Sequence, residues 1–336
     1  MRAASVKDVA DRAGVSVGTV SNVLNNPDRV ASATRERVQA AIAELGFVRN
    51  DAARQLRAGQ SRTIGLVLLD AANPFYAALA AGAEDEAAQH NSTVLLASSQ
   101  GDPRREERYI DLFEEQRVQG LLISPVGDPS ARLAQLVGRG VPTVLVDRDA
   151  EAETYGSASV DDVHGGRLAV EHLVAGGRRR IAFLASDPGL RQVADRFAGA
   201  RAAAEAAGAE LEFVRTSGMT ILGGRAAAAD LLRRETTPDA IFCANDLLAT
   251  GVLQALIMDG RYRVPEDVAL VGYDDIEFAS SAIVPLTTVR RPAEEMGRTA
   301  VRMLLGRADV EHTVFKPELV IRASTARETG EASAAH

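Results

Sequence analysis

Several residue types are rare in this chain of 336 residues, which has no tryptophan, one cysteine and 4% aromatic residues. The single cysteine, Cys243, excludes a disulfide within the chain and suits a reducing compartment. The stretch around it, DAIFCAN, indicates a small apolar side chain in a strand. No apolar run reaches the roughly 20 residues of a transmembrane helix, and no signal segment is recognisable. We therefore expect a cytoplasmic protein without a membrane partner.

Signatures of catalysis and metal binding are also missing. We expect no GxSxG nucleophile elbow, and the chain has no P-loop, HExxH pair or metal-spaced cluster of cysteine and histidine. Its five histidines are scattered, at positions 90, 164, 172, 312 and 336. The chain is therefore predicted not to be an enzyme, with no catalytic residue, no metal site and no cofactor.

Residues 5–26, SVKDVADRAGVSVGTVSNVLNN, predict two short helices joined by a tight turn at Gly14. Ser5 can cap the first helix while Asp8, three residues on, completes a capping box, and Ser16 can cap the second helix. Apolar residues at helical spacing give each helix an inner face. These residues are Val6, Val9, Ala10, Ala13, Val20, Val23 and Leu24. A third helix is predicted from about residue 32 to residue 45, before Gly46.

The outer face of the second helix suits the major groove of DNA. It carries small or amide side chains without charge, and asparagine can pair bidentately with adenine. These residues are Val17, Gly18, Ser21, Asn22 and Asn25. A generic three-helix bundle is the alternative, but cap, turn, core and groove positions all fall in register here, which favours a helix-turn-helix. Further candidates for DNA contact are Ser5, Val6, Ser16, Thr19, Arg29 and Thr34.

Charge divides the chain in the same way. Residues 1–62 hold ten basic and six acidic residues, a net charge of +4, whereas the whole chain carries −8, which leaves −12 for the remainder. A basic end favours phosphate binding there, and an acidic body discourages DNA from wrapping around it. Because the surplus is modest, we expect tight binding to need two copies of the basic end.

From residue 63 onward, apolar strands alternate with amphipathic helices, which predicts an α/β fold of parallel sheets covered by helices on both faces. The predicted strands are 63–70, 92–98, 120–125, 142–147, 180–186, 212–216, 239–245 and 268–275. The predicted helices include 75–90, 104–117, 191–207 and 246–258.

Polar residues gather where these strands end, which is where open α/β sheets bind ligands. Carboxylates, amides and guanidinium groups beside aromatic rings suit a small polar metabolite. The candidates are Phe75, Tyr76, Asp147, Arg148, Asp161, Arg191, Arg196, Met219, Asn245 and Asp274. Such residues also cap helices, and we prefer that role for Asp246 and Asp275. For Arg196, Asn245 and Asp274 we favour ligand contact.

Two sets of residues carry a resemblance to the LacI/GalR family of bacterial transcription regulators. VKDVADRAGVSVGTVSNVLNN is nearly the family consensus, and NDAARQLRAG at 50–59 resembles its hinge helix. In the body, NPFYAAL (73–79), CANDLLATGVL (243–253) and VPEDVALVGYDD (264–275) resemble the family's periplasmic-binding-protein-like core. The resemblance covers essentially residues 1–326.

The resemblance implies a small all-α helix-turn-helix domain followed by a two-lobed core with three crossovers, near residues 161, 290 and 322. The implied parts are a DNA-binding domain at 1–48, a hinge helix and linker at 49–61, an N-lobe at 62–161 with 291–322, a C-lobe at 162–290 with 323–328 and a disordered tail at 329–336. It also implies base contacts by Val17, Gly18 and Asn22. Asn50, Ala53 and Leu56 of the hinge are implied DNA contacts, with Leu56 wedged into the minor groove.

The function implied is repression of transcription, with affinity for a pseudo-palindromic operator controlled by a small effector between the lobes. A sugar is the family default, while an acidic or phosphorylated metabolite or a nucleobase is an alternative. We expect a homodimer that uses the apolar faces near 75–90 and 275–285, and no tetramer, because the tail lacks leucine heptads. A sugar-transport component and an architectural DNA protein are the competing functions. The sequence leaves open whether the effector releases or promotes DNA binding.

Overall fold

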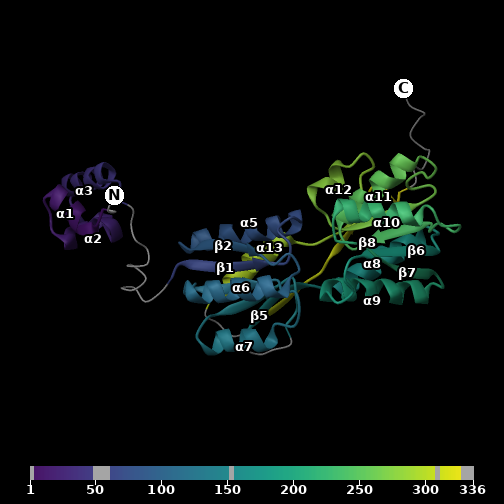
Figure 1. Cartoon of the computed structure of the whole chain (residues 1–336), viewed down its shortest axis with the longest axis horizontal. Helices are drawn as coiled ribbons and strands as arrows, with labels where there is room; N and C mark the ends of the chain where they lie inside the picture. The colour runs from purple at the N-terminus through teal and green to yellow at the C-terminus, as the bar shows by residue number, and fades with distance from the viewer. Residues whose placement is uncertain (1–3, 48–60, 151–154, 307–310, 327–336) are drawn as a thin grey trace, which may run out of the picture. The chain divides into compact units, whose positions relative to one another are not determined.

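The computed structural model describes residues 4–47, 61–150, 155–306 and 311–326 (Figure 1). The chain forms two compact units, residues 1–61 and residues 62–336. We call the described part of the first unit the head and the second unit the core, and describe each by itself. Among the described residues, no helix is both long enough and apolar enough to cross a membrane.

The head consists of three α-helices, α1 (Val6–Ala13), α2 (Val17–Asn25) and α3 (Ser32–Leu45), with a short 3-10 helix, η1 (Pro27–Arg29). The predicted capping box is confirmed, since Ser5 accepts from the Asp8 amide and Asp8 accepts from the Ser5 amide. Gly14 ends α1 at φ +65°, a left-handed conformation that glycine adopts without steric cost. The three helices enclose a small apolar core, which includes Val9, Val20 and Val38.

Residues 14–18, GVSVG, do have the letters of a GxSxG nucleophile elbow, contrary to our expectation from the sequence. A nucleophile elbow requires a strand that turns sharply into a helix. Here the same letters join helix α1 to helix α2, and the Ser16 side chain accepts from the Thr19 amide as the N-cap of α2. The local structure is therefore that of a helix-turn-helix and not of a hydrolase.

The core contains two six-stranded sheets, one in each lobe. In the N-lobe the strand order is β11-β5-β4-β3-β1-β2, all parallel. Its strands are β1 Thr63–Leu68, β2 Thr93–Ser98, β3 Gly120–Ile123, β4 Thr143–Val146, β5 Gly156–Val160 and β11 His312–Phe315. Its helices are α5 Pro74–Gln89, α6 Pro103–Glu115, α7 Ser130–Gly138 and α13 Ala293–Gly306. Helices α5 and α13 pack together although they come from opposite ends of the core sequence (Figure 1).

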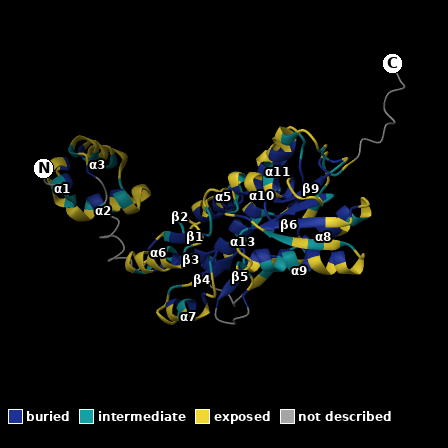
Figure 2. Cartoon of the chain, turned by 45° about the vertical axis from the view of Figure 1, so that its right-hand side comes forward, coloured by how far each residue is buried: buried dark blue, intermediate teal, exposed yellow. Residues whose placement is uncertain are grey.

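In the C-lobe the strand order is β12-β10-β9-β8-β6-β7, and only β12 is antiparallel to its neighbour among these described strands. Its strands are β6 Arg180–Ala185, β7 Glu210–Arg215, β8 Ala240–Cys243, β9 Ala269–Asp274, β10 Thr287–Arg290 and β12 Glu318–Val320. Its helices are α8 Asp162–Ala175, α9 Arg191–Ala206, α10 Ile221–Leu231, α11 Asp246–Asp259 and α12 Glu277–Ser281. Figure 2 shows buried strands inside each lobe and exposed outer faces on its helices.

The eight strands and four helices predicted for the core are all present, with ends that differ by a few residues. The chain passes between the lobes at residue 161, at 291–292 and at 316–317. The third crossover was expected near residue 322, which is wrong because β12 at 318–320 already belongs to the C-lobe sheet. Strands β5, β10, β11 and β12 were not predicted, since they are short and each carries at most two large apolar side chains, in GSASV, TTVR, HTVF and ELV.

Candidate functional site

The head presents an uncharged polar face on α2. Val17 is 43% exposed, and Gly18, Asn22 and Asn25 are exposed. The Asn25 amide donates to the backbone oxygen of Ser21 at 2.9 Å, whereas the apolar side of α2 packs inward. Exposed small and amide side chains on one side of a capped helix can approach base edges in a major groove.

The other candidates for DNA contact lie around this helix. Ser5 and Ser16 cap the two helices, so their hydroxyl groups already have partners within the head. Thr19 and Thr34 are half-buried, and Arg29 is exposed on η1. The hinge candidates Asn50, Ala53 and Leu56 lie outside the described residues.

In the core, the residues that the sequence placed at strand ends meet between the lobes around Arg291, a residue that the sequence analysis did not single out. The Arg291 guanidinium pairs with Asp147 Oδ1 at the end of β4 and with Asp274 Oδ1 at the end of β9, the latter through Nη2 at 2.5 Å and Nε at 3.0 Å. Its Cζ atom lies 3.4 Å from the centre of the Phe75 ring. One guanidinium thus joins a carboxylate of each lobe.

Asp147 and Asp274 each accept further hydrogen bonds, and each has one partner from the opposite lobe. Asp147 Oδ2 accepts from the Tyr76 hydroxyl at 2.9 Å, and Gln192 Nε2 of the C-lobe donates to the Asp147 backbone oxygen at 2.9 Å. Asp274 Oδ2 accepts from Asn73 Nδ2 of the N-lobe at 2.9 Å. Both aspartates have left-handed backbones, at φ +58° and +110°. Such strained conformations of non-glycine residues concentrate at functional sites.

A cavity of about 310 Å³ lies beside this network and is lined by both lobes. Its lining residues include Asp147, Arg148, Ser159, Asp162, Arg191 and Gln192. The hydroxyl group of Ser159 is buried without a hydrogen-bond partner among the described residues. A buried polar atom without a partner costs free energy unless water or a ligand satisfies it. The cavity is therefore suited to a small ligand that carries hydroxyl groups.

The prediction that Arg196 contacts the ligand is not supported by its surroundings. Its side chain is 4% exposed, and Nε donates to Asp162 Oδ1 at 2.9 Å while Nη1 donates to the Ala244 backbone oxygen at 2.7 Å. The Arg196 Cζ atom lies 3.9 Å from the centre of the Tyr273 ring, whose hydroxyl also donates to Asp162. All these partners belong to the C-lobe, so Arg196 stabilises that lobe and lines no part of the cavity.

Three other candidates also have local partners. Asp161 accepts from the His164 amide as the N-cap of α8. Asn245 accepts from the Leu248 amide as the N-cap of α11 and donates to the Met219 backbone oxygen at 3.1 Å. Met219 packs against the apolar core of the C-lobe. None of the three lines the cavity.

The capping roles preferred for Asp246 and Asp275 are wrong. Asp246 is fully buried and accepts from the Ile276 amide at 3.0 Å and from the Thr288 hydroxyl at 2.7 Å, while Asn245 supplies the cap of α11. Asp275 pairs with Arg290 and Arg322, each at 2.7 Å. Asp246 therefore ties the start of α11 to Ile276 and to strand β10, and Asp275 ties the segment after β9 to Arg290 and Arg322.

Burial and neighbouring charges alter the acidity of this region. Burial raises the pKa of Asp147, although the adjacent Arg291 lowers it. Burial and the nearby Asp274 raise the pKa of Asp246 well above its ordinary value. The Asp147 and Asp274 carboxylates hold the pKa of the Arg291 guanidinium well above its usual range despite burial, so Arg291 stays charged.

Comparisons with known proteins agree with this arrangement. Residues 5–50 match the family described as "Bacterial regulatory proteins, lacI family", and residues 170–325 match "Periplasmic binding protein-like domain". The chain is 36% identical over 303 residues to the "Ribose operon repressor" of Bacillus subtilis (strain 168), which covers 90% of this chain and 91% of that protein.

Solved structures extend the similarity to three dimensions. The lac repressor dimer bound to operator and the anti-inducer ONPF has a TM-score of 0.84 at 30% identity, covering 97% of this chain and 100% of that one. A LacI family regulator from Enterococcus faecium with bound ribose has a TM-score of 0.72 at 26% identity, covering 79% of this chain and 98% of that one. With its helix-turn-helix head and two-lobed core, the chain belongs to the LacI family of bacterial regulatory proteins.

Proposed function

We propose that this protein is a dimeric repressor of transcription whose affinity for operator DNA is controlled by a small neutral sugar bound between the lobes. The observation that carries the proposal is the cavity lined by both lobes in a chain that also has a helix-turn-helix. A ligand that contacts both lobes binds one arrangement of them better than another, and this difference in affinity is what effector control requires.

The lining of the cavity supports a neutral polyhydroxy ligand. Five aspartates line it against two arginines; Arg291 and Arg196 pair with two of these aspartates, but the acids still outnumber the bases, which disfavours an anion such as a sugar phosphate. The charged residues of the lining are Asp128, Asp147, Asp149, Asp162, Asp195, Arg148 and Arg191. The unpartnered Ser159 hydroxyl can accept from or donate to a sugar hydroxyl. A volume of about 310 Å³ is at the lower end of the usual range for ligand pockets, which suits a monosaccharide. Ribose is the first candidate because relatives are named for it or contain it.

The head supplies sequence recognition in this proposal. Val17, Gly18 and Asn22 on the exposed face of α2 contact base edges, and Thr19, Thr34 and Arg29 contact phosphates. Asn50, Ala53 and Leu56 contact the operator centre, with Leu56 as the minor-groove wedge. Because operator DNA is the partner, we also propose a cytoplasmic location.

Two copies of the head, and hence a homodimer, are needed because one head carries little positive charge. Phe278 and Ile283, which are 50% and 87% exposed, support an interface that includes residues 275–285. A dimer with two-fold symmetry binds a pseudo-palindromic operator, since each half-site meets one head.

The experiment has two stages, of which the first is selection of binding sequences by the full-length chain from random duplex DNA. We expect a palindromic sequence that binds more tightly than random DNA at the same salt concentration. Recovery of no preferred sequence would contradict the proposal.

The second stage is calorimetry with D-ribose, ribose 5-phosphate and adenine. We expect heat of binding from ribose and weaker binding of the phosphate, because the lining is acidic. Tighter binding of ribose 5-phosphate or adenine than of ribose would contradict the assigned effector class, whatever the DNA result.

A further inference from the structure

Arg291 lies on the second crossover, between strand β10 of the C-lobe and helix α13 of the N-lobe. Its side chain is 2% exposed although the residue belongs to neither sheet. The two carboxylates that it contacts are separated from it by 144 residues, for Asp147, and by 17 residues, for Asp274. A residue on a crossover is therefore the centre of the contacts between the lobes.

The guanidinium separates two hollow regions of the molecule. Asp147 lines the cavity of about 310 Å³, while Asp274 and Phe75 line a second, more open cavity of about 690 Å³. Arg291 itself lines the second cavity, and its guanidinium group contacts Asp147, which lines the first cavity. The space between the two aspartates is thus filled by the chain itself.

Arg291 has there the kind of contacts that a bound ligand would have. Its flat group stacks on the Phe75 ring, and its nitrogen atoms donate to both carboxylates. The remaining carboxylate oxygen atoms also have donors, from Tyr76 to Asp147 and from Asn73 to Asp274. Both oxygen atoms of each aspartate therefore already have donors within the chain.

We propose that Arg291 is an internal occupant of the cleft, which holds the two lobes together in the absence of effector. This inference concerns the lobes alone and does not rest on the proposed function.

The physical reason is the charge balance between the lobes. Without the guanidinium, Asp147 of the N-lobe and Asp274 of the C-lobe lose the counter-charge that they share. Two buried carboxylates without a cation are unfavourable, because burial penalises each charge and like charges repel. Opening of the lobes relieves both effects by admitting water. The arginine therefore favours the closed arrangement, and a neutral replacement favours an open one.

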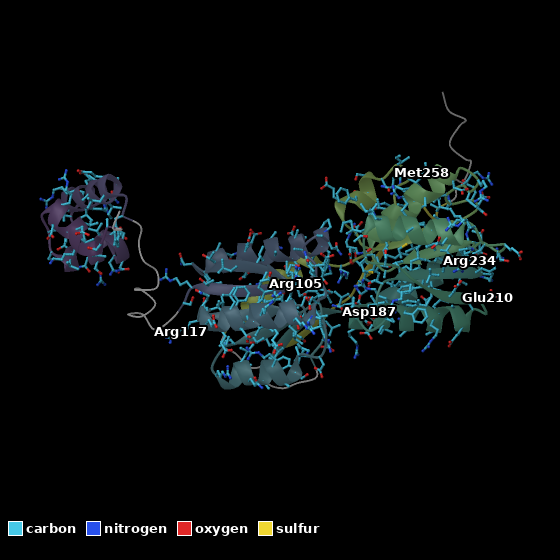
Figure 3. The ribbon with its side chains drawn as sticks, in the orientation of Figure 1. Arg105, Arg117, Asp187, Glu210, Arg234 and Met258 are labelled. Carbon is cyan, nitrogen blue, oxygen red and sulfur yellow. The ribbon has the colours of Figure 1, made fainter. Side chains whose placement is uncertain are left out.

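The test measures the distance between the lobes in the full-length chain without effector. Arg105 of the N-lobe and Glu210 of the C-lobe, both labelled in Figure 3, are replaced by cysteine and spin-labelled. Cys243 is fully buried and stays in place. Labelled chains are mixed with an excess of unlabelled chains, so that double electron–electron resonance records distances within one chain.

We expect one narrow distance distribution for the otherwise unchanged chain, and a shift of most of the population to different distances in Arg291→Gln. Arg263→Gln is the matched control, because Arg263 is 71% exposed and pairs with Asp267 within the C-lobe. That control should keep the distribution of the unchanged chain. An unchanged distribution in Arg291→Gln would overturn the proposal.

Two additions keep the result decisive. If Arg291→Gln does not fold, Arg291→Met replaces it, since methionine fills a similar space without a charge; an unchanged distribution there would equally overturn the proposal. D-Ribose is then added to each variant. If the distance distribution of Arg291→Gln is shifted without ribose, the result supports Arg291 as an internal occupant of the cleft. This holds even if ribose changes the distances in none of the variants, which would show that the assigned effector is wrong.

Discussion

The head and the cleft of the core place their polar groups in opposite ways. On α2 of the head, the residues assigned to base contact, Val17, Gly18 and Asn22, are exposed, and the hydrogen bond that the structure gives to Asn25 goes to Ser21, four residues away. In the cleft, the polar groups are buried, and their partners lie far away in the sequence, as for Asp147 and Arg291. A continuous stretch therefore predicts the first surface, whereas the second depends on which distant residues the fold brings together.

Among the variants that test this comparison, we expect the largest loss of stability from a substitution of the buried Arg196 of the C-lobe. Arg196→Ala leaves the buried carboxylate of Asp162 without its cation, which should lower the free energy of unfolding by about 3–5 kcal/mol. Urea unfolding of the full-length chain measures the loss. Arg263→Gln, an exposed arginine in an ion pair, should cost less than about 1 kcal/mol. An equally small loss for Arg196→Ala, together with loss of effector binding, would restore Arg196 as a ligand residue.

The second prediction concerns the exposed groups of the head. Asn22→Ala should weaken operator binding by about 1–3 kcal/mol, the usual contribution of one bidentate base contact. Its stability should change by no more than about 0.5 kcal/mol, because the side chain is exposed. Fluorescence anisotropy on the selected operator and on random DNA measures both affinities. Gln39→Ala, which removes an exposed amide of α3, is the control, and an equal effect of the two variants would contradict base recognition by Asn22.

The third prediction compares two helix starts within the head. Ser5 caps α1, whereas α3 begins after Ala31, which has no side-chain cap. Ser5→Ala should lower the stability of the head by about 1 kcal/mol, and Ala31→Ser should raise it by up to about the same amount. Hydrogen exchange of the head amides measures both changes. Equal protection in all three proteins would show that the caps do not limit the stability of the head.

The smallest effect is expected from His172 of the C-lobe, which contacts the Thr325 hydroxyl at 2.7 Å. Burial lowers the pKa of His172 in the folded chain, so the unfolded chain binds the proton more readily. Stability from this group is present above about pH 6.5, the ordinary histidine value, and is lost as the pH falls towards the lower folded pKa. The melting temperature of His172→Gln should therefore fall less between pH 7.5 and pH 5.5 than the melting temperature of the unchanged chain. An identical pH dependence would contradict the assignment.

Much of the fold could be predicted from the sequence, for reasons that particular elements make clear. The run TIGLVLLD is long and apolar enough to indicate a buried strand, and SVKDVADRAG carries its own cap and turn. Strands β11 (HTVF) and β12 (ELV) could not be recognised, because they are short and only partly buried, whereas the similarly short β3, β4 and β8 are fully buried and almost wholly apolar.

The candidate site was predicted less completely. Asp147 and Asp274 were identified because polar residues at strand ends mark the cleft. Arg291 precedes a proline and a helix, and nothing in that context indicates that its side chain bridges two lobes. Arg196 was assigned to the ligand because it follows the end of β6, and its pairing with Asp162, which lies 34 residues away, could not be predicted from local sequence. Local sequence therefore indicated the location of the cleft but not its internal pairing.

The most direct test of effector control is operator binding by the full-length chain, titrated with D-ribose and followed by fluorescence anisotropy. The unchanged chain and Ser159→Ala should bind the operator equally, since the Ser159 hydroxyl faces the cavity without a partner among the described residues. Ribose should shift the operator affinity of the unchanged chain. Ser159→Ala should bind ribose more weakly by about 0.5–1.5 kcal/mol, the net contribution of one hydrogen bond, and should therefore need a higher ribose concentration for the same shift. An operator affinity that no sugar changes, or an identical ribose response in both proteins, would contradict control of DNA binding through this cavity.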